Sequence, residues 1–271
     1  MRHAFHLYRY VNLLSLDIVA GAVISAVFFS RLLEAPLLPY ALIALALTVW
    51  IIYTADHLRD ARHIGPDATS DRHAFHHRHF MTLMVAMLMA LLADGVVIIF
   101  MRERILTAGL CLSAVVAVYL LLHRYLKWAK EIIVAGLYTC GILLPSIAIS
   151  PLTISLPYVI LFAVFALLAL INLLVLSWFD YDSDLQDRQP SFATVLGKAT
   201  TRKVTFMLIG ANFAGTGCLF ALEFEPAVVF ILLAMNVVLL LTFLFARTGD
   251  RNNTYRLFGD GVFLLPLVYL L

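Results

Sequence analysis

Nine long apolar runs divide the chain, and they restrict its fold more than any other feature of the sequence. Most of them are close to the ~20 residues that an α-helix needs to cross the hydrocarbon core of a bilayer. A segment in lipid must satisfy its backbone hydrogen bonds internally, so we expect each run to form one transmembrane helix. The expected spans are Val11–Ser30, Pro36–Tyr53, Phe80–Phe100, Ile105–Leu122, Ile132–Ile149, Leu156–Phe179, Val204–Leu222, Pro226–Phe245 and Leu257–Leu271.

The composition agrees with an all-α, polytopic membrane helical bundle that forms one transmembrane domain over residues 1–271. Hydrophobic residues make up 63% of the chain and charged residues 13%, and the mean hydropathy is +0.95. Soluble domains carry about 25% charged residues. The net charge of +2 gives no basis for nucleic-acid binding. Arg2 and Arg9 precede the first run as in a signal peptide, but Asp17 interrupts that run, so we expect a retained span.

The basic residues give the expected spans a direction. Cytoplasmic loops of membrane proteins carry an excess of Lys and Arg. If the N-terminus is cytoplasmic, only Arg31, Arg102 and Arg104 of the 19 Lys and Arg residues fall on the opposite side. We therefore expect a multi-pass protein of the bacterial inner-membrane type, with the N-terminus in the cytoplasm and the C-terminus on the other side.

Two clusters of aspartates lie in the two long cytoplasmic loops, about 54–79 and 180–203. Each cluster contains the spacing D-x-x-x-D, which places two carboxylates on one face of a helix, about 5–6 Å apart. Their mutual repulsion is relieved if a hard divalent cation such as Mg²⁺ lies between them. The alternative is a solvated loop whose acids balance nearby arginines. The aspartates with this spacing are Asp56, Asp60, Asp180 and Asp184.

Basic residues and histidines surround the first cluster. Arg72 follows it, and Arg124 lies at the cytoplasmic end of the fourth span. Arginine binds diphosphate groups through two parallel hydrogen bonds, so both are candidates for a phosphate site, although both also fit simple membrane anchoring. The pattern His73-x-x-His76-His77-x-His79 could bind a transition metal, or it could be a solvated surface.

The sequence resembles the UbiA superfamily of intramembrane prenyltransferases. The segment from Asp180 to Asp184, followed by Ser191-Phe-Ala-Thr194-Val-Leu-Gly197, is similar to the second aspartate motif of that family. Asp56 and Asp60 resemble the later part of its first motif. The number of spans and their orientation also agree. The chain departs from the family pattern at Ile52 and Tyr53, where the first motif begins with Asn and Asp, and in Tyr119-Leu-Leu-Leu-His123, where lysine is common at the last position.

The resemblance implies a UbiA-like fold and the Mg²⁺-dependent transfer of an isoprenyl group from a prenyl diphosphate to an aromatic or other lipophilic acceptor in the bilayer. It makes four aspartates the catalytic metal ligands: Asp56, Asp60, Asp180 and Asp184. Tyr53, Tyr119 and Trp178 are candidates for stabilising an allylic cation. The residues expected to bind substrate, or to orient its ligands and waters, are Arg72, Tyr119, His123, Arg124, Asn172, Asp182 and Asp187.

Two other functions remain open at this point. A protein with this fold but lost or altered chemistry, acting as a lipid-binding or accessory membrane protein, is suggested by Ile52 and Tyr53. A transporter that uses the acids for cations should carry them near the bilayer midplane. The acids instead cluster at the cytoplasmic ends of the spans. The sequence therefore favours the prenyltransferase and the accessory protein over the transporter.

Overall fold

The computed structural model describes residues 2–66, 69–246 and 254–271, with the side chains of residues 2–7, 123 and 124 outside the described part. All regular structure in these residues is helical, which confirms the all-α class. The long helices are α2 (Leu16–Leu32), α3 (Pro39–Ile64), α5 (Phe80–Ile98), α6 (Glu103–Leu126), α7 (Lys130–Ile149), α8 (Leu156–Phe179), α11 (Lys198–Ala221) and α12 (Pro226–Phe245). The short helices are α1 (Arg2–Leu13), α4 (Asp71–Arg78), η1 (Lys127–Ala129), α9 (Tyr181–Gln186), α10 (Phe192–Leu196), α13 (Thr254–Gly261), η2 (Val262–Leu264) and α14 (Leu267–Leu270).

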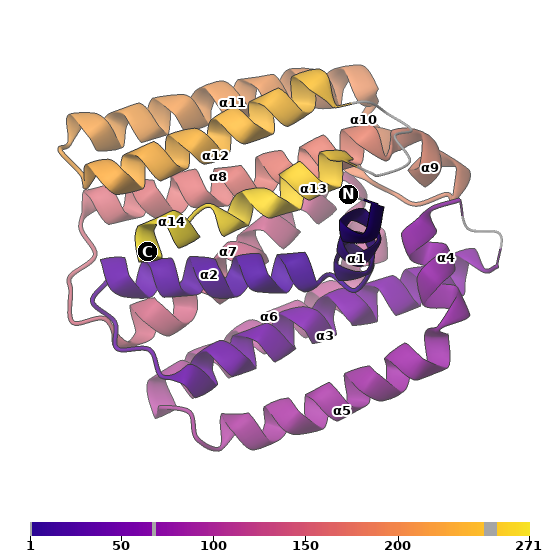
Figure 1. Ribbon diagram of the computed structural model, residues 1–271, viewed down its shortest axis with the longest axis horizontal. Helices are drawn as coiled ribbons and strands as arrows, with labels where there is room; N and C mark the ends of the chain where they lie inside the picture. Colours follow the sequence, from indigo (N-terminus) through magenta and orange to yellow (C-terminus); the bar gives the residue numbers. More distant parts are fainter. Residues whose placement is uncertain (1, 67–68, 247–253) are drawn as a thin grey trace.

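The described helices form a bundle suited to a membrane. Seven of them are long and apolar enough to cross a bilayer: α3, α5, α6, α7, α8, α11 and α12. The 17-residue α2 and the run α13, η2 and α14 lie beside them (Figure 1). The expected polytopic bundle of about nine helices is therefore confirmed, and α8 and α12 begin and end at the predicted residues.

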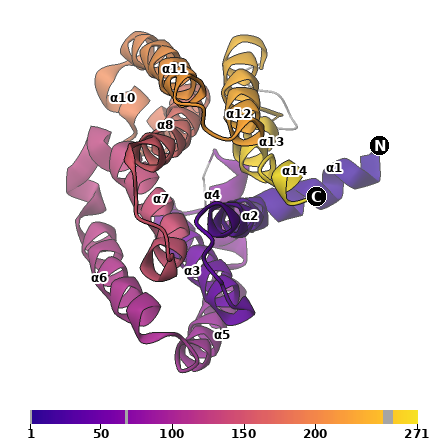
Figure 2. The same cartoon turned by 90° about the vertical axis from the view of Figure 1, so that its left-hand side faces the viewer.

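The core of the bundle is built mainly from α8, α12 and α2, with a smaller contribution from α7. Helices α2, α7 and α8 lie near the centre of the end-on view in Figure 2. Phe165, Leu168, Ile171 and Val175 of α8 are fully buried there. Outer helices instead present large apolar side chains to their surroundings, for example Leu92 on α5, which is 67% exposed. A surface of this kind is suited to lipid rather than to water.

Helix α3 carries the first aspartate pair beyond the hydrocarbon layer. Its 26 residues rise about 39 Å at 1.5 Å per residue, against a core thickness of about 30 Å. The span predicted to end at Tyr53 therefore continues as a helix to Ile64, and Asp56 and Asp60 lie on its last turns rather than in a loop.

The first predicted span is interrupted rather than continuous. Helix α1 ends at Leu13, and Ser15 takes a left-handed conformation with φ of 56° before α2 begins. The break is supported from outside the segment, because the Ser15 hydroxyl lies 3.3 Å from Nε2 of His57 on α3. Asn12 and Asp17, on either side of the break, are buried.

The last predicted span, Leu257–Leu271, is also interrupted. Helix α13 passes into the 3₁₀ turn η2, and Pro266, which lacks an amide hydrogen, precedes the short α14. Gly259 lets α13 approach α8 closely, since a Cβ atom at this position would lie 2.5 Å from Oδ1 of Asn172. The close approach at Gly259 is a tertiary contact that hydropathy cannot predict.

Both predicted loops contain short helices, and these gather at one end of the bundle. Figure 1 shows α4, α9 and α10 at this end, while the C-terminus lies at the opposite end. Helix α1 contacts α4 there, through Arg9 with Asp71 and Tyr10 with Phe75. We call this the motif end, because it carries both aspartate motifs.

Candidate active site

A cavity of about 220 Å³ lies between the helices at the motif end. Helices α2, α3, α4, α7, α8, α9 and α13 contribute to its wall, together with the segment that leads into α10. The polar residues that line it include Asp56, His57, Asp60, Arg72, Lys130, Glu131, Asn172, Asp180, Asp184, Arg256 and Asp260.

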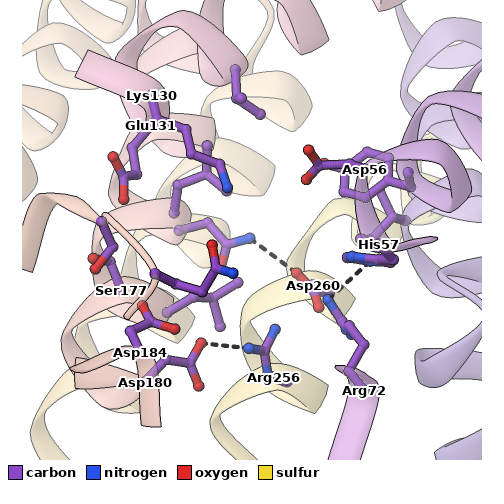
Figure 3. Close-up of a pocket in the computed structure, with 18 of the residues that line it drawn as sticks. Asp56, His57, Arg72, Lys130, Glu131, Ser177, Asp180, Asp184, Arg256 and Asp260 are labelled. Atoms are coloured by element: carbon purple, nitrogen blue, oxygen red, sulfur yellow. Dashed lines mark hydrogen bonds and ion pairs between the residues drawn. The ribbon is translucent and has the colours of Figure 1, made fainter. Parts of the chain in front are cut away.

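Both aspartate pairs line this one cavity. Asp56 lies on one side of it, and Asp180 and Asp184 lie on the opposite side (Figure 3). Asp60 lines the cavity one turn further along α3 than Asp56. Oδ1 of Asp56 is buried and has no hydrogen-bond partner among the described residues. Because a buried carboxylate oxygen without a partner is costly, this atom is suited to receive a cation.

Asp180 is held by the C-terminal helix α13. The Tyr255 hydroxyl donates a hydrogen bond of 2.6 Å to Oδ1 of Asp180, and Arg256 forms an ion pair with Oδ2. The Tyr255 ring stacks on Phe179, with the ring centres 4.8 Å apart. A guanidinium therefore already balances the charge of Asp180.

Asp184 differs electrostatically from Asp180. Burial, together with the nearby charge of Asp180, raises the pKa of the Asp184 carboxyl to about 7. Two carboxylates that share a site favour the neutral form of one of them unless a cation arrives. The second pair thus holds one balanced carboxylate and one that exchanges its proton near neutral pH.

Two further basic side chains line the cavity, Arg72 from α4 and Lys130 from the start of α7. Nη2 of Arg72 donates a hydrogen bond of 3.1 Å to Oδ1 of Asn12. Nη1 of Arg72 lies 3.5 Å from Nε2 of His57. These contacts fix Arg72 against the break between α1 and α2, so this arginine is positioned before any ligand arrives.

The segment after the second motif is anchored to the bundle by two buried side chains. Glu131 accepts a hydrogen bond of 2.7 Å from the Phe192 amide, and Ser177 accepts one of 3.1 Å from the Ala193 amide. Ser191 and Thr194 add a reciprocal capping box at the start of α10. The segment that resembles the trailing part of the family motif therefore fixes the chain at the edge of the cavity.

Asp187 joins the two motif loops. Its Oδ1 accepts hydrogen bonds from the Thr69 amide at 3.0 Å and from the Thr69 hydroxyl at 2.7 Å, and its Oδ2 lies 3.3 Å from Nδ1 of His73. Burial alone would raise the pKa of Asp187, but the hydrogen bonds from Thr69 and His73 lower it below its usual value. We call these three residues the loop latch.

Of the remaining residues expected to bind substrate, only some line the cavity. Asn172 lines the cavity, whereas Asp182 is exposed and its Oδ2 lies 3.6 Å from Nζ of Lys198. Tyr119 is buried on α6 and is absent from the cavity wall. His123 and Arg124 also lie on α6, and their side chains are outside the described part of the chain.

Sequence analysis did not assign Lys130, Glu131, Tyr255 or Arg256 to the site. Lys130 and Arg256 were counted only as basic residues that orient the spans. One signal was available for Arg256, because it precedes Asp260 by four residues and so shares a face of the helix with a buried acid.

Two histidines of the first loop contact backbone carbonyl oxygens of the protein. His76 contacts the Arg72 carbonyl oxygen through Nδ1 at 2.9 Å, and His77 contacts the Ala61 carbonyl oxygen at 3.3 Å. Within the described residues, no three His, Cys, Asp or Glu side chains are arranged to hold a metal ion by themselves.

Neither protein-family models nor curated proteins match the sequence. Solved structures do match the fold. A UbiA homologue from Archaeoglobus fulgidus, bound to DMAPP and Mg²⁺, has a TM-score of 0.66 and 13% identity, over 96% of this chain and 98% of that one. The apo UbiA homologue from Aeropyrum pernix has a TM-score of 0.66 and 16% identity, over 95% and 99% of the two chains.

A structure described as digeranylgeranylglyceryl phosphate synthase matches with a TM-score of 0.56 and 13% identity, over 97% of each chain. The similarity thus extends over nearly the whole chain, while the identities are low. The resemblance expected from the two aspartate motifs is confirmed in the architecture: the chain has the fold of the UbiA homologues.

Proposed function

We propose that the protein transfers an isoprenyl group from a prenyl diphosphate to an aromatic or other lipophilic acceptor, with Mg²⁺ as its cofactor. The observation that carries this proposal is the meeting of two aspartate pairs and three basic side chains in one cavity. The UbiA homologue that binds DMAPP and Mg²⁺ supports the same class of substrate. As part of this proposal, residues 1–271 form one transmembrane domain with the motif end in the cytoplasm.

The residues of the cavity fit magnesium ions that bind together with a diphosphate. Mg²⁺ prefers oxygen ligands and is usually held by one or two carboxylates plus phosphate oxygens and waters. The four aspartates offer only oxygen atoms, and Oδ1 of Asp56 is buried without a partner in the described chain. In this proposal the ions are held by Asp56, Asp60, Asp180 and Asp184, and when bound they neutralise the leaving diphosphate.

The protein's own side chains bind the diphosphate and protect the reacting carbon. Arg72 and Lys130 provide positive charge, and Arg72 is already held in place by Asn12. In the proposed reaction the allylic C–O bond breaks with its electron pair on the diphosphate, the allylic carbon bonds to the acceptor, and the acceptor loses one proton. Part of the cavity wall is apolar and includes Val134, Ala135 and Leu173. In this proposal these side chains keep water away from the allylic carbon.

Arg256 has two roles in this proposal. In the structure described here it neutralises Asp180, so a metal ion must compete with it for that carboxylate. Once the ion is bound, the guanidinium is free to bind the diphosphate in a bidentate manner. Arg256 therefore opposes metal binding in the empty protein and assists substrate binding in the loaded one.

A second function is favoured by one pair of observations. Tyr53 stands where the family motif has its first aspartate, and Arg256 occupies Asp180. Both features lower the affinity of the cavity for metal. A protein that binds prenyl lipids without turning them over, acting as a lipid-binding or accessory membrane protein, is the alternative.

Release of pyrophosphate from a prenyl diphosphate, measured on purified protein with and without Mg²⁺ and acceptor, separates the two functions. The proposed enzyme releases pyrophosphate only with Mg²⁺, and Asp56→Ala and Asp180→Ala each abolish the release. Asp182→Ala, outside the cavity, serves as the matched control and retains activity. Binding of prenyl diphosphate without any turnover would favour the accessory protein.

A further inference from the structure

We infer that the deep end of the cavity binds the acceptor through a hydroxyl group, and that the acceptor carries no negative charge there. The inference rests on the proposed function and assigns the class of the second substrate. It depends on three residues of the cavity wall: Tyr138, Asn172 and Asp260.

The cavity has two levels, which the helices define. Helix α7 runs inward from Lys130, and Tyr138 follows eight residues later. Helix α8 runs outward to Asp180, and Asn172 precedes it by eight residues. Eight residues of helix correspond to about 12 Å. Tyr138 and Asn172 thus lie at a common depth, below the level of the aspartate pairs.

A buried carboxylate belongs to this deep level. Asp260 is 4% exposed and lines the cavity, one helical turn beyond Arg256 on α13. Figure 3 shows it between the two sides of the site. The side-chain amides of Asn172 and Asn12 donate hydrogen bonds to its two oxygens, at 3.3 and 3.4 Å. These two amides fix the Asp260 carboxylate, which has further lone pairs available to accept a donor from a ligand.

A second polar group at this deep level, the Tyr138 hydroxyl, has no hydrogen-bond partner within the described residues. The Tyr138 hydroxyl oxygen is buried. Its ring packs edge-to-face on Phe263, 5.5 Å between centres, and Phe263 follows Asp260 by three residues. A buried phenol rarely lacks a partner, so a ligand is the natural source of one.

A hydroxyl group is the ligand group that satisfies both side chains. It donates its hydrogen to Asp260 and accepts one from Tyr138. The neighbouring wall is apolar and includes Ala169, Leu173 and Phe263, as a flat lipophilic ring requires. An apolar cavity of about 150 Å³ is enough for one benzene ring, so the cavity of about 220 Å³ has room for a substituted ring.

The same residues disfavour an acidic acceptor. Asp17 is 5% exposed, and Asn12 donates to Asp17 at 2.7 Å as well as to Asp260, so two carboxylates share one amide at this depth. A carboxylate on the acceptor would be buried beside both of them. The guanidinium of Arg72 already donates a hydrogen bond to Oδ1 of Asn12. We therefore expect a neutral phenol-like or alcohol-like acceptor rather than an aromatic acid.

The test uses two probes that share one ring: hydroquinone, and the same ring with a carboxylate, 2,5-dihydroxybenzoate. Binding of each to the purified full-length protein is measured by titration calorimetry, first alone and then with Mg²⁺ and inorganic pyrophosphate present. Hydroquinone should bind at least about tenfold more tightly than the acid. Equal affinity, or tighter binding of the acid, overturns the inference.

Three variants locate the binding site of hydroquinone. Tyr138→Phe should weaken it about fivefold, and this change breaks no described hydrogen bond within the protein. Asp260→Asn should weaken it about tenfold or more. Tyr158→Phe is the control, because the Tyr158 hydroxyl donates to the Leu32 carbonyl oxygen outside the cavity. If Tyr138→Phe and Asp260→Asn both bind hydroquinone like the wild type, the deep level is only a structural contact between helices.

Failure of the proposed function gives a different result in the same samples. A protein that cannot bind a prenyl diphosphate shows no titration with geranyl diphosphate and Mg²⁺, whatever its affinity for hydroquinone. Conversely, Tyr158→Phe should bind geranyl diphosphate as the wild type does, because Tyr158 lies outside the cavity wall.

Discussion

The Thr69 hydroxyl donates a hydrogen bond of 2.7 Å to Oδ1 of Asp187, which joins two loops that lie 118 residues apart in the sequence. The Thr69 amide and His73 add to the same carboxylate, so the loop latch ties the chain after α3 to the chain after α9. Because residues of both loops line the cavity, we expect the loop latch to stabilise the motif end of the bundle.

Replacing Asp187 with alanine should destabilise the motif end. The change removes up to three hydrogen bonds, one of them from a partly buried histidine, and we expect a loss of about 1–3 kcal/mol in the free energy of unfolding. Asp182→Ala is the matched control, since its contact with Lys198 is solvent-exposed and contributes less than about 1 kcal/mol. Thermal unfolding in detergent measures both. Equal melting temperatures for the two variants would contradict a structural role of the latch.

Replacing Arg256 with glutamine should change metal and substrate binding in opposite directions. Without the guanidinium, Asp180 is free, so Mn²⁺ used as a probe for Mg²⁺ should bind the empty protein more tightly, by about tenfold. Geranyl diphosphate should bind about tenfold or more weakly, because one phosphate ligand is lost. Electron paramagnetic resonance of Mn²⁺ and titration calorimetry provide the two measurements. Arg202→Gln, which removes a charge from a residue that does not line the cavity, should change neither.

The raised pKa of Asp184 predicts a proton release on metal binding. Below a pH of about 7 this carboxyl is mostly protonated, so an incoming ion must displace the proton. The affinity for Mg²⁺ should therefore fall as the pH falls below about 7, by up to about tenfold per pH unit. Calorimetry at pH 6.5 in buffers of different ionisation enthalpy counts the protons. Asp184→Asn should bind the ion more weakly and release none, and proton release that persists in this variant would assign it to another group.

Two histidines of α4, the buried His76 and the partly buried His73, predict a loss of stability in acid. Burial lowers the pKa of His76 to about 4 and lowers that of His73, so both are neutral in the folded protein at neutral pH. The unfolded chain takes up these protons near pH 6.5, before the folded one does. Their contribution to stability is therefore complete above about pH 6.5 and is lost progressively between pH 6.5 and 4.

The variant His76→Gln isolates the contribution of His76, because every other titrating group is common to the wild type and the variant. Between pH 6.5 and 4, the free energy of unfolding of the wild type should fall by about 2 kcal/mol more than that of the variant, after allowance for solvent screening. Denaturation at several pH values provides the comparison. Parallel pH profiles would show that His76 titrates normally in the folded protein.

Hydropathy predicted those elements whose boundaries are set by their own sequence. Helices α8 and α12 begin after a Ser or Glu with a proline in their first turn, and they end where polar residues return, so local signals suffice. The first and last spans were predicted as continuous. They are broken by contacts with distant parts of the chain, Ser15 with His57 and Gly259 with Asn172.

The candidate site, like the fold, was predictable only where a local sequence signal marks its residues. The D-x-x-x-D spacing is a local signal, and it identified four of the five aspartates that line the cavity, all except Asp260. Lys130 and Arg256 lack such a pattern. A basic residue at the end of a span has the same sequence signature whether it anchors the helix at the interface or turns into the bundle, and only the packing of α7 and α13 separates the two cases.

The broken last helix makes the final eighteen residues part of the site as well as part of the bundle. Tyr255, Arg256 and Asp260 all lie on α13, and Gly259 lets that helix fit against α8 with no space for a methyl group. A chain cut short before residue 254 would keep its long helices and both aspartate motifs. It would nevertheless lack Arg256, which balances the charge of Asp180, and Asp260, the carboxylate at the deep level of the cavity. The two aspartate motifs therefore need this C-terminal segment to form a complete binding site.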